Sequence, residues 1–303
     1  MRWRPSGSIQ VEDRRGAGGG GGLGGLGTGG LGSGGIPIPV GGGIGGIVLV
    51  IIIIVVLNLV GGGGGTVPSG GLTGAPGGAI ASLDPKDNEG QFVNAVTVDV
   101  QTFWGEEFSA AGKSYPQTVT VLFTDQTQSG CGTASSATGP FYCPVDQKVY
   151  LDTGFFDELS NRFGAPGAFA QAYVIAHEFG HHVQDALGKM DQVASRQQSN
   201  PGSANDLSIR LELQADCYAG VWAHSVWTTP DQANVESITD QDVQDAINAA
   251  QAVGDDRIQE QATGTIDKET WTHGSAAQRS KWFSSGFKGG TTDSCDTFTP
   301  ATP

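Results

Sequence analysis

The chain has 303 residues, a formal net charge of −15 and 49 glycines. An acidic chain without a cluster of Lys and Arg is not expected to bind nucleic acid, because binding to the phosphate backbone depends on such clusters. Most of the glycines lie in residues 16–46 and 61–78, where the composition cannot build a packed core. We therefore expect one folded domain, at residues 82–303.

Residues 40–60 form an apolar run without a charged side chain, long enough as a helix to span a bilayer. Four arginines lie in the Gly-rich region 1–39 before it, so the positive-inside rule places that region in the cytoplasm. The sequence thus predicts a single-pass protein of the cell membrane, with a Gly-rich linker at 61–81 and an extracytoplasmic domain. A cleaved signal peptide is the alternative, but the cleavage-like triplet at 79–81 lies well beyond the apolar run.

The first part of the domain contains both helix and strand patterns. Apolar residues at helical spacing predict a helix over residues 88–111, although a strand at 95–100 is the alternative because Val and Thr alternate there. Strands are expected at 117–123 and 148–152, and a helix at 154–163.

The four cysteines all lie beyond the apolar run, as expected for an extracytoplasmic domain with two disulfides. Cys131 and Cys143 flank a turn-rich loop, which favours the pairs Cys131–Cys143 and Cys217–Cys295 among three possible connectivities. A four-cysteine zinc site is the rival interpretation, but the chain has no CxxC spacing.

Residues 172–188, AYVIAHEFGHHVQDALG, predict a helix that Pro166 and Gly167 precede. Residues four apart share a helix face, so His177 and His181 can bind one metal ion. Zn²⁺ accepts such nitrogen ligands, and a catalytic site adds a third protein ligand and leaves one position open. Glu178 is placed to act as the general base.

A second long helix is expected at residues 206–227 and supplies the third ligand. Glu212 and Asp216 are spaced i, i+4 on it, so Glu212 can bind zinc while Asp216 accepts the second ring N–H of a ligand histidine. The small residues Ala215, Ala219 and Gly220 would let the two helices approach closely.

Two further helices are expected at 239–254 and 275–285. His273, just before the last of them, is a candidate catalytic residue that would stabilise an oxyanion. His182 and His224 are interpreted as structural, because His182 points about 100° away from His181 on the helix and His224 has no partner in sequence.

Five segments resemble one known family: SGCG, TGPFYCPVDQKVYLD, FAQAYVIAHEFGHHVQ, RLELQADCYAGVW and THGSAAQRSKWF. The sequence is similar there to the bacterial membrane-anchored proteins named putative neutral zinc metallopeptidases. The resemblance implies a zincin-like domain with His177, His181 and Glu212 as metal ligands and Glu178 as catalyst. It also favours a role for His273.

The sequence therefore predicts an α+β zincin-like fold: a small sheet, a helix with HExxH and a helix with ExxxD, behind one transmembrane helix. The predicted function is a zinc-dependent metalloendopeptidase with one Zn²⁺ per chain and a peptide or protein substrate, which pairs with an edge strand at 148–152 or 117–123. The alternative is an inactive zinc-bound scaffold that binds envelope proteins or polymers, which would need a fourth protein ligand.

Overall fold

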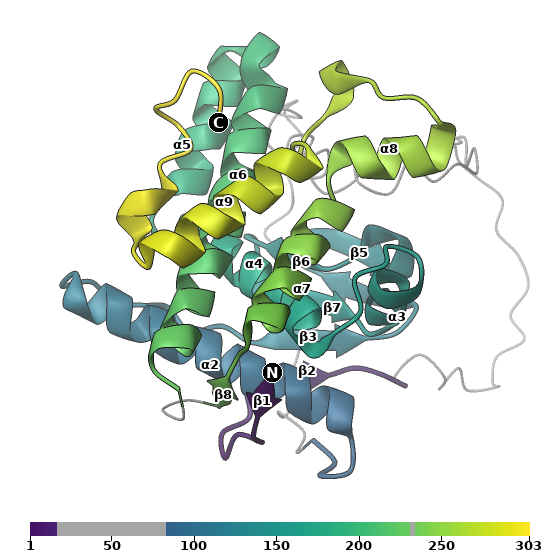
Figure 1. The fold of residues 1–303 in the computed structure, drawn as a ribbon, viewed down its shortest axis with the longest axis vertical. Coiled ribbons are helices and arrows are strands. Elements are labelled where there is room, and N and C mark those ends of the chain that lie inside the picture. The colour runs from purple at the N-terminus through teal and green to yellow at the C-terminus, as the bar shows by residue number, and fades with distance from the viewer. Residues whose placement is uncertain (17–82, 231–233) are drawn as a thin grey trace, which may run out of the picture.

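The computed structural model describes residues 1–16, 83–230 and 234–303 (Figure 1). The membrane anchor expected at residues 40–60 and the linker expected at 61–81 lie outside these described residues. Within the described part, no helix combines the length and the apolar character needed to cross a bilayer.

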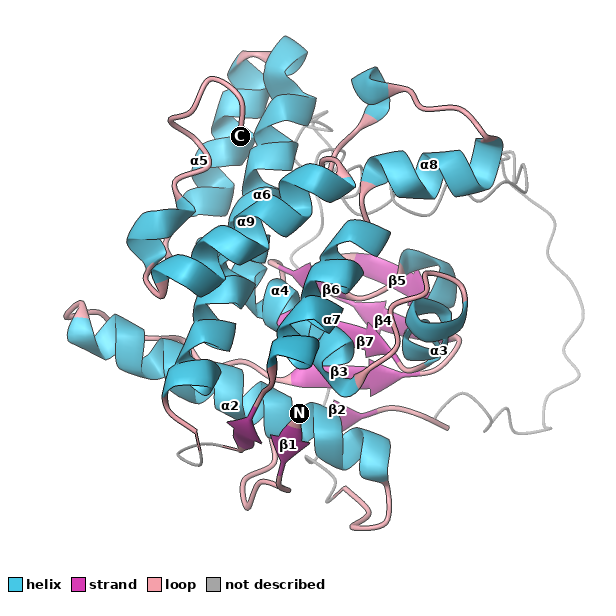
Figure 2. Ribbon diagram, viewed as in Figure 1, coloured by secondary structure: helices cyan, strands magenta, loops and turns pink. Residues whose placement is uncertain are grey.

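The chain forms an α+β fold in which strands and helices alternate irregularly (Figure 2). The described strands are β1 (Arg2–Trp3), β2 (Val11–Asp13), β3 (Thr120–Phe123), β4 (Gln126–Ser129), β5 (Gly132–Ser135), β6 (Phe141–Cys143), β7 (Lys148–Asp152) and β8 (Val235–Ser237). The described α-helices are α2 (Asn88–Ala110), α3 (Gly154–Asn161), α4 (Ala168–Ala186), α5 (Lys189–Ser199), α6 (Ala204–Thr228), α7 (Asp240–Ala252), α8 (Asp255–Thr263) and α9 (Ala276–Gly289).

A four-stranded sheet in the order β2-β3-β7-β6 forms the centre of the strand region. β2, β3 and β7 run parallel, whereas β6 is antiparallel to β7 and ends the sheet. Both strands predicted from sequence are present as β3 and β7, but each lies between two neighbours. The prediction that one of them is a free edge for substrate is therefore wrong; the described edges are β2 and β6.

The first residues of the chain belong to the same folded body. β1 pairs antiparallel with β8, and β2 pairs parallel with β3, with Val11 opposite Thr120 and fully buried. The Met1 ammonium lies 2.6 Å from an Asp242 carboxylate oxygen on α7. Residues 1–16 therefore fold together with residues 83–230 and 234–303. The sequence, by contrast, predicts a separate region at residues 1–39.

Most helices form where the periodicity predicts them. α2 is continuous from Asn88 to Ala110, so the strand alternative at residues 95–100 is wrong. Gly167 precedes α4 with a φ of 126°, a conformation that glycine adopts without strain. α5 was not expected, because no element was predicted between the helices at 172–188 and 206–227. Its one buried residue is Val193, so it lacks the apolar stripe that would reveal it in the sequence.

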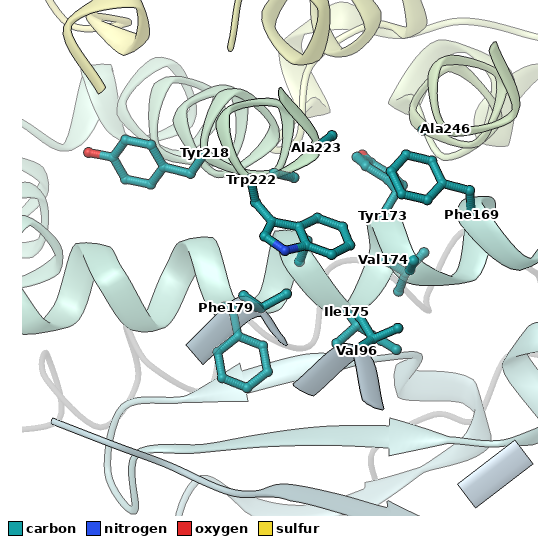
Figure 3. Packing of buried hydrophobic residues seen from close by; sticks show 14 of the residues in the cluster. Val96, Phe169, Tyr173, Val174, Ile175, Phe179, Tyr218, Trp222, Ala223 and Ala246 are labelled. Carbon is teal, nitrogen blue, oxygen red and sulfur yellow. The ribbon is translucent and has the colours of Figure 1, made fainter. Parts of the chain in front are cut away.

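The main core lies between α2, α4, α6 and α7. Figure 3 shows the Trp222 indole extending from α6 toward Ile175 and Phe179 of α4. It stacks on the Phe169 ring with centroids 5.7 Å apart. These four side chains, of Phe169, Ile175, Phe179 and Trp222, are fully buried. This packing fixes the position of α4 relative to α6.

The two predicted disulfides are confirmed: Cys131 bonds Cys143, and Cys217 bonds Cys295. The first joins the β4–β5 hairpin to β6. The second joins α6 to the segment after α9, where Gly220 and Gly286 let the backbones of α6 and α9 meet. Gly220 therefore serves the contact with α9, not the expected contact with α4.

Candidate metal site

Helices α4 and α6 bring the three predicted metal ligands together. Ligand atoms of His177, His181 and Glu212 all lie within 4.8 Å of one another, and all three residues are buried. The helices approach closely because a Cβ at Gly180 would lie only 3.0 Å from the Ala215 backbone. Ala215 thus has the role predicted for it.

The spacing of these atoms fits a zinc ion. The Nε2 atom of His177 lies 3.2 Å from one Glu212 carboxylate oxygen, and the Nε2 atom of His181 lies 3.4 Å from the other. Bonds of about 2.0–2.1 Å in tetrahedral geometry place ligand atoms about 3.4 Å apart. The donor set of two imidazoles and one carboxylate is one that catalytic zinc sites use.

Hydrogen bonds direct both histidines toward this point. The Nδ1–H of His177 donates to an Asp216 oxygen at 2.8 Å, and the Nδ1–H of His181 donates to the Gln184 side-chain oxygen at 2.9 Å. Each bond leaves Nε2 as the unprotonated ligand atom. The predicted contact between Asp216 and a ligand histidine is present, whereas sequence analysis assigned no role to Gln184.

Asp216 belongs to a fully buried network that sequence analysis missed in part. Arg279 donates to both Asp216 oxygens at 2.9 Å, and the Tyr173 hydroxyl donates to one of them at 2.5 Å. Burial alone would raise the pKa of Asp216, but the charge of Arg279 and the hydrogen bonds from His177 and Arg279 lower it to about 2. The carboxylate is therefore ionised. No local spacing reveals Arg279, because it lies 63 positions from Asp216.

Glu178 lies beside the three candidate ligands and lines the same pocket, whose volume is about 270 Å³. The side chain is buried, and no group in the described part of the chain hydrogen-bonds to it. Burial raises the pKa of Glu178, against the lowering effect of the two histidines. Its carboxylate is thus available to accept a proton from a molecule in the pocket.

The remaining histidines lie in different surroundings. His273 lines the pocket, and its Nδ1 lies 2.9 Å from the Thr272 hydroxyl and 3.4 Å from an Asp255 oxygen. His182 donates from Nε2 to the Pro116 carbonyl, and His224 donates from Nδ1 to the Phe287 carbonyl. None of these three joins the candidate metal group among the residues described.

Comparison with known proteins agrees with this site. Residues 1–298 match the family described as "Putative neutral zinc metallopeptidase". The chain belongs to this family. The matched range includes β1 and β2, so the N-terminal strands are part of what the neutral zinc metallopeptidase family shares with this chain.

Two relatives illustrate the similarity. The chain is 44% identical to "Uncharacterized protein YpfJ" of Escherichia coli K12 over 219 residues, which cover 72% of this chain and 74% of the relative. It is 52% identical to "Uncharacterized protein Rv2575" of Mycobacterium tuberculosis H37Rv over 185 residues, 59% and 62% of the two chains. No solved structure matches the chain.

Proposed function

We propose that the protein is a zinc-dependent metalloendopeptidase with a zincin-like site. The convergence of His177, His181 and Glu212, with no fourth ligand among the described residues, carries this proposal. A purely structural zinc site would be closed by a fourth protein ligand. His177, His181 and Glu212 line one pocket together with Glu178, and a zinc ion that they hold would keep one position free for solvent or substrate, which favours a peptidase over a scaffold.

The chain's own residues supply the proton transfers. A bound zinc ion would polarise a peptide carbonyl and lower the pKa of a water molecule. The Glu178 carboxylate accepts the proton of the attacking water and delivers it to the leaving amine. Asp216 and Gln184 hold the two ligand imidazoles in place during this reaction.

His273 is proposed to donate to the oxyanion that develops on the substrate. Its Nδ1 faces Thr272 and Asp255. Burial lowers the pKa of His273, but the Glu212 and Asp255 carboxylates outweigh this effect and raise it, so the protonated ring can donate from Nε2 into the pocket. Asp255 also accepts hydrogen bonds from the backbone N–H groups of residues 272, 273 and 274, and these fix the segment that carries the imidazole. A preorganised donor of this kind suits oxyanion stabilisation.

The substrate backbone is proposed to pair with β6. This strand ends the sheet within the described residues, and Phe141 and Tyr142 line the pocket. An extended peptide can add to such an edge through backbone hydrogen bonds, which hold it without selecting its sequence.

We also propose that the folded body works outside the cytoplasm, because two disulfides persist only in an oxidising compartment. Pairing of β2 with β3 puts residues 1–16 on the same side of any membrane as the metal site. A cytoplasmic N-terminus is therefore incompatible with an extracytoplasmic metal site in this fold, and we propose that both lie outside. A single pass through residues 40–60 would separate residues 1–16 from the metal site, so the predicted single-pass anchor does not fit this arrangement.

Labelling of intact cells tests this arrangement. Ser8 and Ala277 are both exposed, and each can be replaced by Cys. A membrane-impermeant maleimide should label both variants to the same extent. Labelling of Ala277→Cys alone would support a cytoplasmic N-terminus and contradict the pairing of β2 with β3.

The peptidase proposal is tested with the zinc-loaded full chain and a diverse peptide library. Wild type should cleave peptides, chelation should stop cleavage, and Glu178→Gln should remove it while zinc content stays the same. Glu107→Gln, an exposed carboxylate on α2, is the control and should cleave like wild type. Equal cleavage by Glu178→Gln and wild type would refute the proposed role of Glu178.

A further inference from the structure

The pocket beside the candidate metal site has walls that the metal chemistry does not explain. One wall comes from the segments around α3 and α8, and the other from α5 and α6. The apolar side chains of these walls are Phe155, Phe163, Ile258, Met190, Val193 and Leu211. They line the same pocket as Glu178 and the three candidate ligands, so a peptide at the site would contact them.

The charges of the pocket are already paired. Apart from Glu178 and the candidate ligands, its lining residues that can carry a charge near neutral pH are Glu158, Arg162, Arg279 and His273 among those described, and His273 lies 3.4 Å from an Asp255 oxygen. Glu158 and Arg162 lie 3.8 Å apart, and Arg279 forms its ion pair with Asp216. The net charge of −15 is therefore not concentrated in this pocket, and it gives no reason to expect a basic substrate.

The volume of about 270 Å³ limits what can enter. That is room for a bulky side chain with a short stretch of backbone. It lies just below the range of about 300–1,000 Å³ that is typical of sites for whole small ligands.

We propose that this pocket selects peptides with a bulky apolar side chain, such as Leu, Met or Phe, next to the bond that is cleaved. The proposal rests on the proposed peptidase function and names its substrate class. The side chain enters a region whose walls expose apolar groups and offer no unpaired charge. The free energy gained when such a side chain leaves water for this region favours these peptides over peptides with a small or charged side chain.

The test uses the zinc-loaded full chain and alanine-based host peptides that differ at one position: Phe, Leu, Ala, Lys or Asp. We expect kcat/KM for the Phe and Leu peptides to exceed that for Ala by about 10-fold or more, and those for Lys and Asp to be lowest. Equal values for all five would overturn the proposal while leaving the peptidase function in place.

Substitutions on the two walls identify the residues that determine which substrate side chain is preferred. Met190→Lys and Phe163→Lys each add a charge at a half-buried position, where a lysine stem can still reach water. One or both should reduce the preference for Phe and increase relative cleavage of the Asp peptide. Leu187→Lys is the matched control, because Leu187 is 36% exposed and does not line the pocket. Unchanged preferences in both wall variants, with unchanged thermal unfolding, would contradict the assignment.

A binding measurement separates this inference from the proposed function. Fluorescently labelled host peptides are titrated with zinc-loaded wild type and with Glu178→Gln, and anisotropy reports binding without cleavage. Tighter binding of Phe and Leu peptides, without cleavage of any peptide by wild type, would support the pocket and refute the peptidase. Equal binding of all five peptides would overturn the pocket assignment.

Discussion

The metal site and the N-terminal strands differ in how far apart their partners lie along the chain. His177 and Glu212 are 35 positions apart, and each lies on a long helix whose i, i+4 spacing aligns a second functional residue. Glu12 of β2 reaches Lys148 of β7 across 136 positions, with an ion pair of 2.8 Å. Local helix geometry thus presets each half of the metal site, whereas the N-terminal strands acquire their position only from the complete sheet.

Loss of a metal ligand should have the largest effect. We expect His181→Ala and Glu212→Ala to reduce zinc affinity by more than about 100-fold, which exceeds the usual effect of changing a residue behind the ligands. Zinc content after dialysis against a competing chelator measures this. His224→Gln is the control, because His224 bonds the Phe287 carbonyl instead of the ligand group. Full zinc retention in Glu212→Ala would mean that a different residue completes the site.

Loss of the buried ion pair between Arg279 and Asp216 should have the second-largest effect. Arg279→Met leaves Asp216 charged and fully buried, and breaking such a pair costs about 3–5 kcal/mol of unfolding free energy. Zinc affinity should also fall by about 10–100-fold, because Asp216 orients His177. Lys281→Met, an exposed change on the same helix, should have little effect on either quantity. An unfolding free energy equal to that of wild type would show that the pair does not support the site.

Asp99 connects the two regions, because it accepts hydrogen bonds from Trp222 of α6 and from the backbone of Val235 in β8, which pairs with β1. Burial raises its pKa to about 6, so its ionisation destabilises the fold above that pH. This unfavourable contribution is complete above the folded pKa and disappears as the pH falls toward the ordinary value of 3.8.

The unfolding free energy of wild type relative to Asp99→Asn should therefore increase by roughly 1–1.5 kcal/mol between pH 7.5 and pH 5. Urea unfolding of both proteins at several pH values measures the difference. A difference that stays constant with pH would show that Asp99 titrates as an ordinary exposed carboxyl.

Loss of packing at the N-terminal strand should lower stability without changing the metal site. Val11→Ala removes two methyl groups from a fully buried position in β2, and we expect the unfolding free energy to fall by about 1–3 kcal/mol. Val145→Ala is the matched control, because Val145 is 71% exposed and should change stability by less than about 0.5 kcal/mol. Zinc affinity should stay the same in both. Equal stability of the two variants would indicate that β2 does not belong to the stable sheet.

The sequence predicted the parts of this molecule that short-range spacing determines. His177, His181, Glu212 and Asp216 follow from helical periodicity, and the helices expected at 239–254 and 275–285 are present as α7 and α9. β3 and β7 were predicted from alternating residues, yet their interior positions depend on β2 and β6, each only three residues long.

Other features have no local signal in the sequence. Arg279 reaches Asp216 only because α9 packs against α6. Gln184, by contrast, lies three residues after His181 on α4, so helical spacing could have revealed it. β1 and β8 are too short for a recognisable alternation, and their pairing joins residues 2–3 to residues 235–237. The same holds for the apolar pocket, because its walls come from four helices and their flanking segments.

The most direct test of the central claim is X-ray absorption at the zinc edge on the zinc-loaded full chain. With His177, His181 and Glu212 as ligands, we expect a first shell of nitrogen and oxygen at about 2.0–2.1 Å. The spectrum should show the multiple scattering of two imidazoles, with one position filled by solvent. Sulfur at about 2.3 Å, or a third imidazole in place of solvent, would contradict the open site of His177, His181 and Glu212.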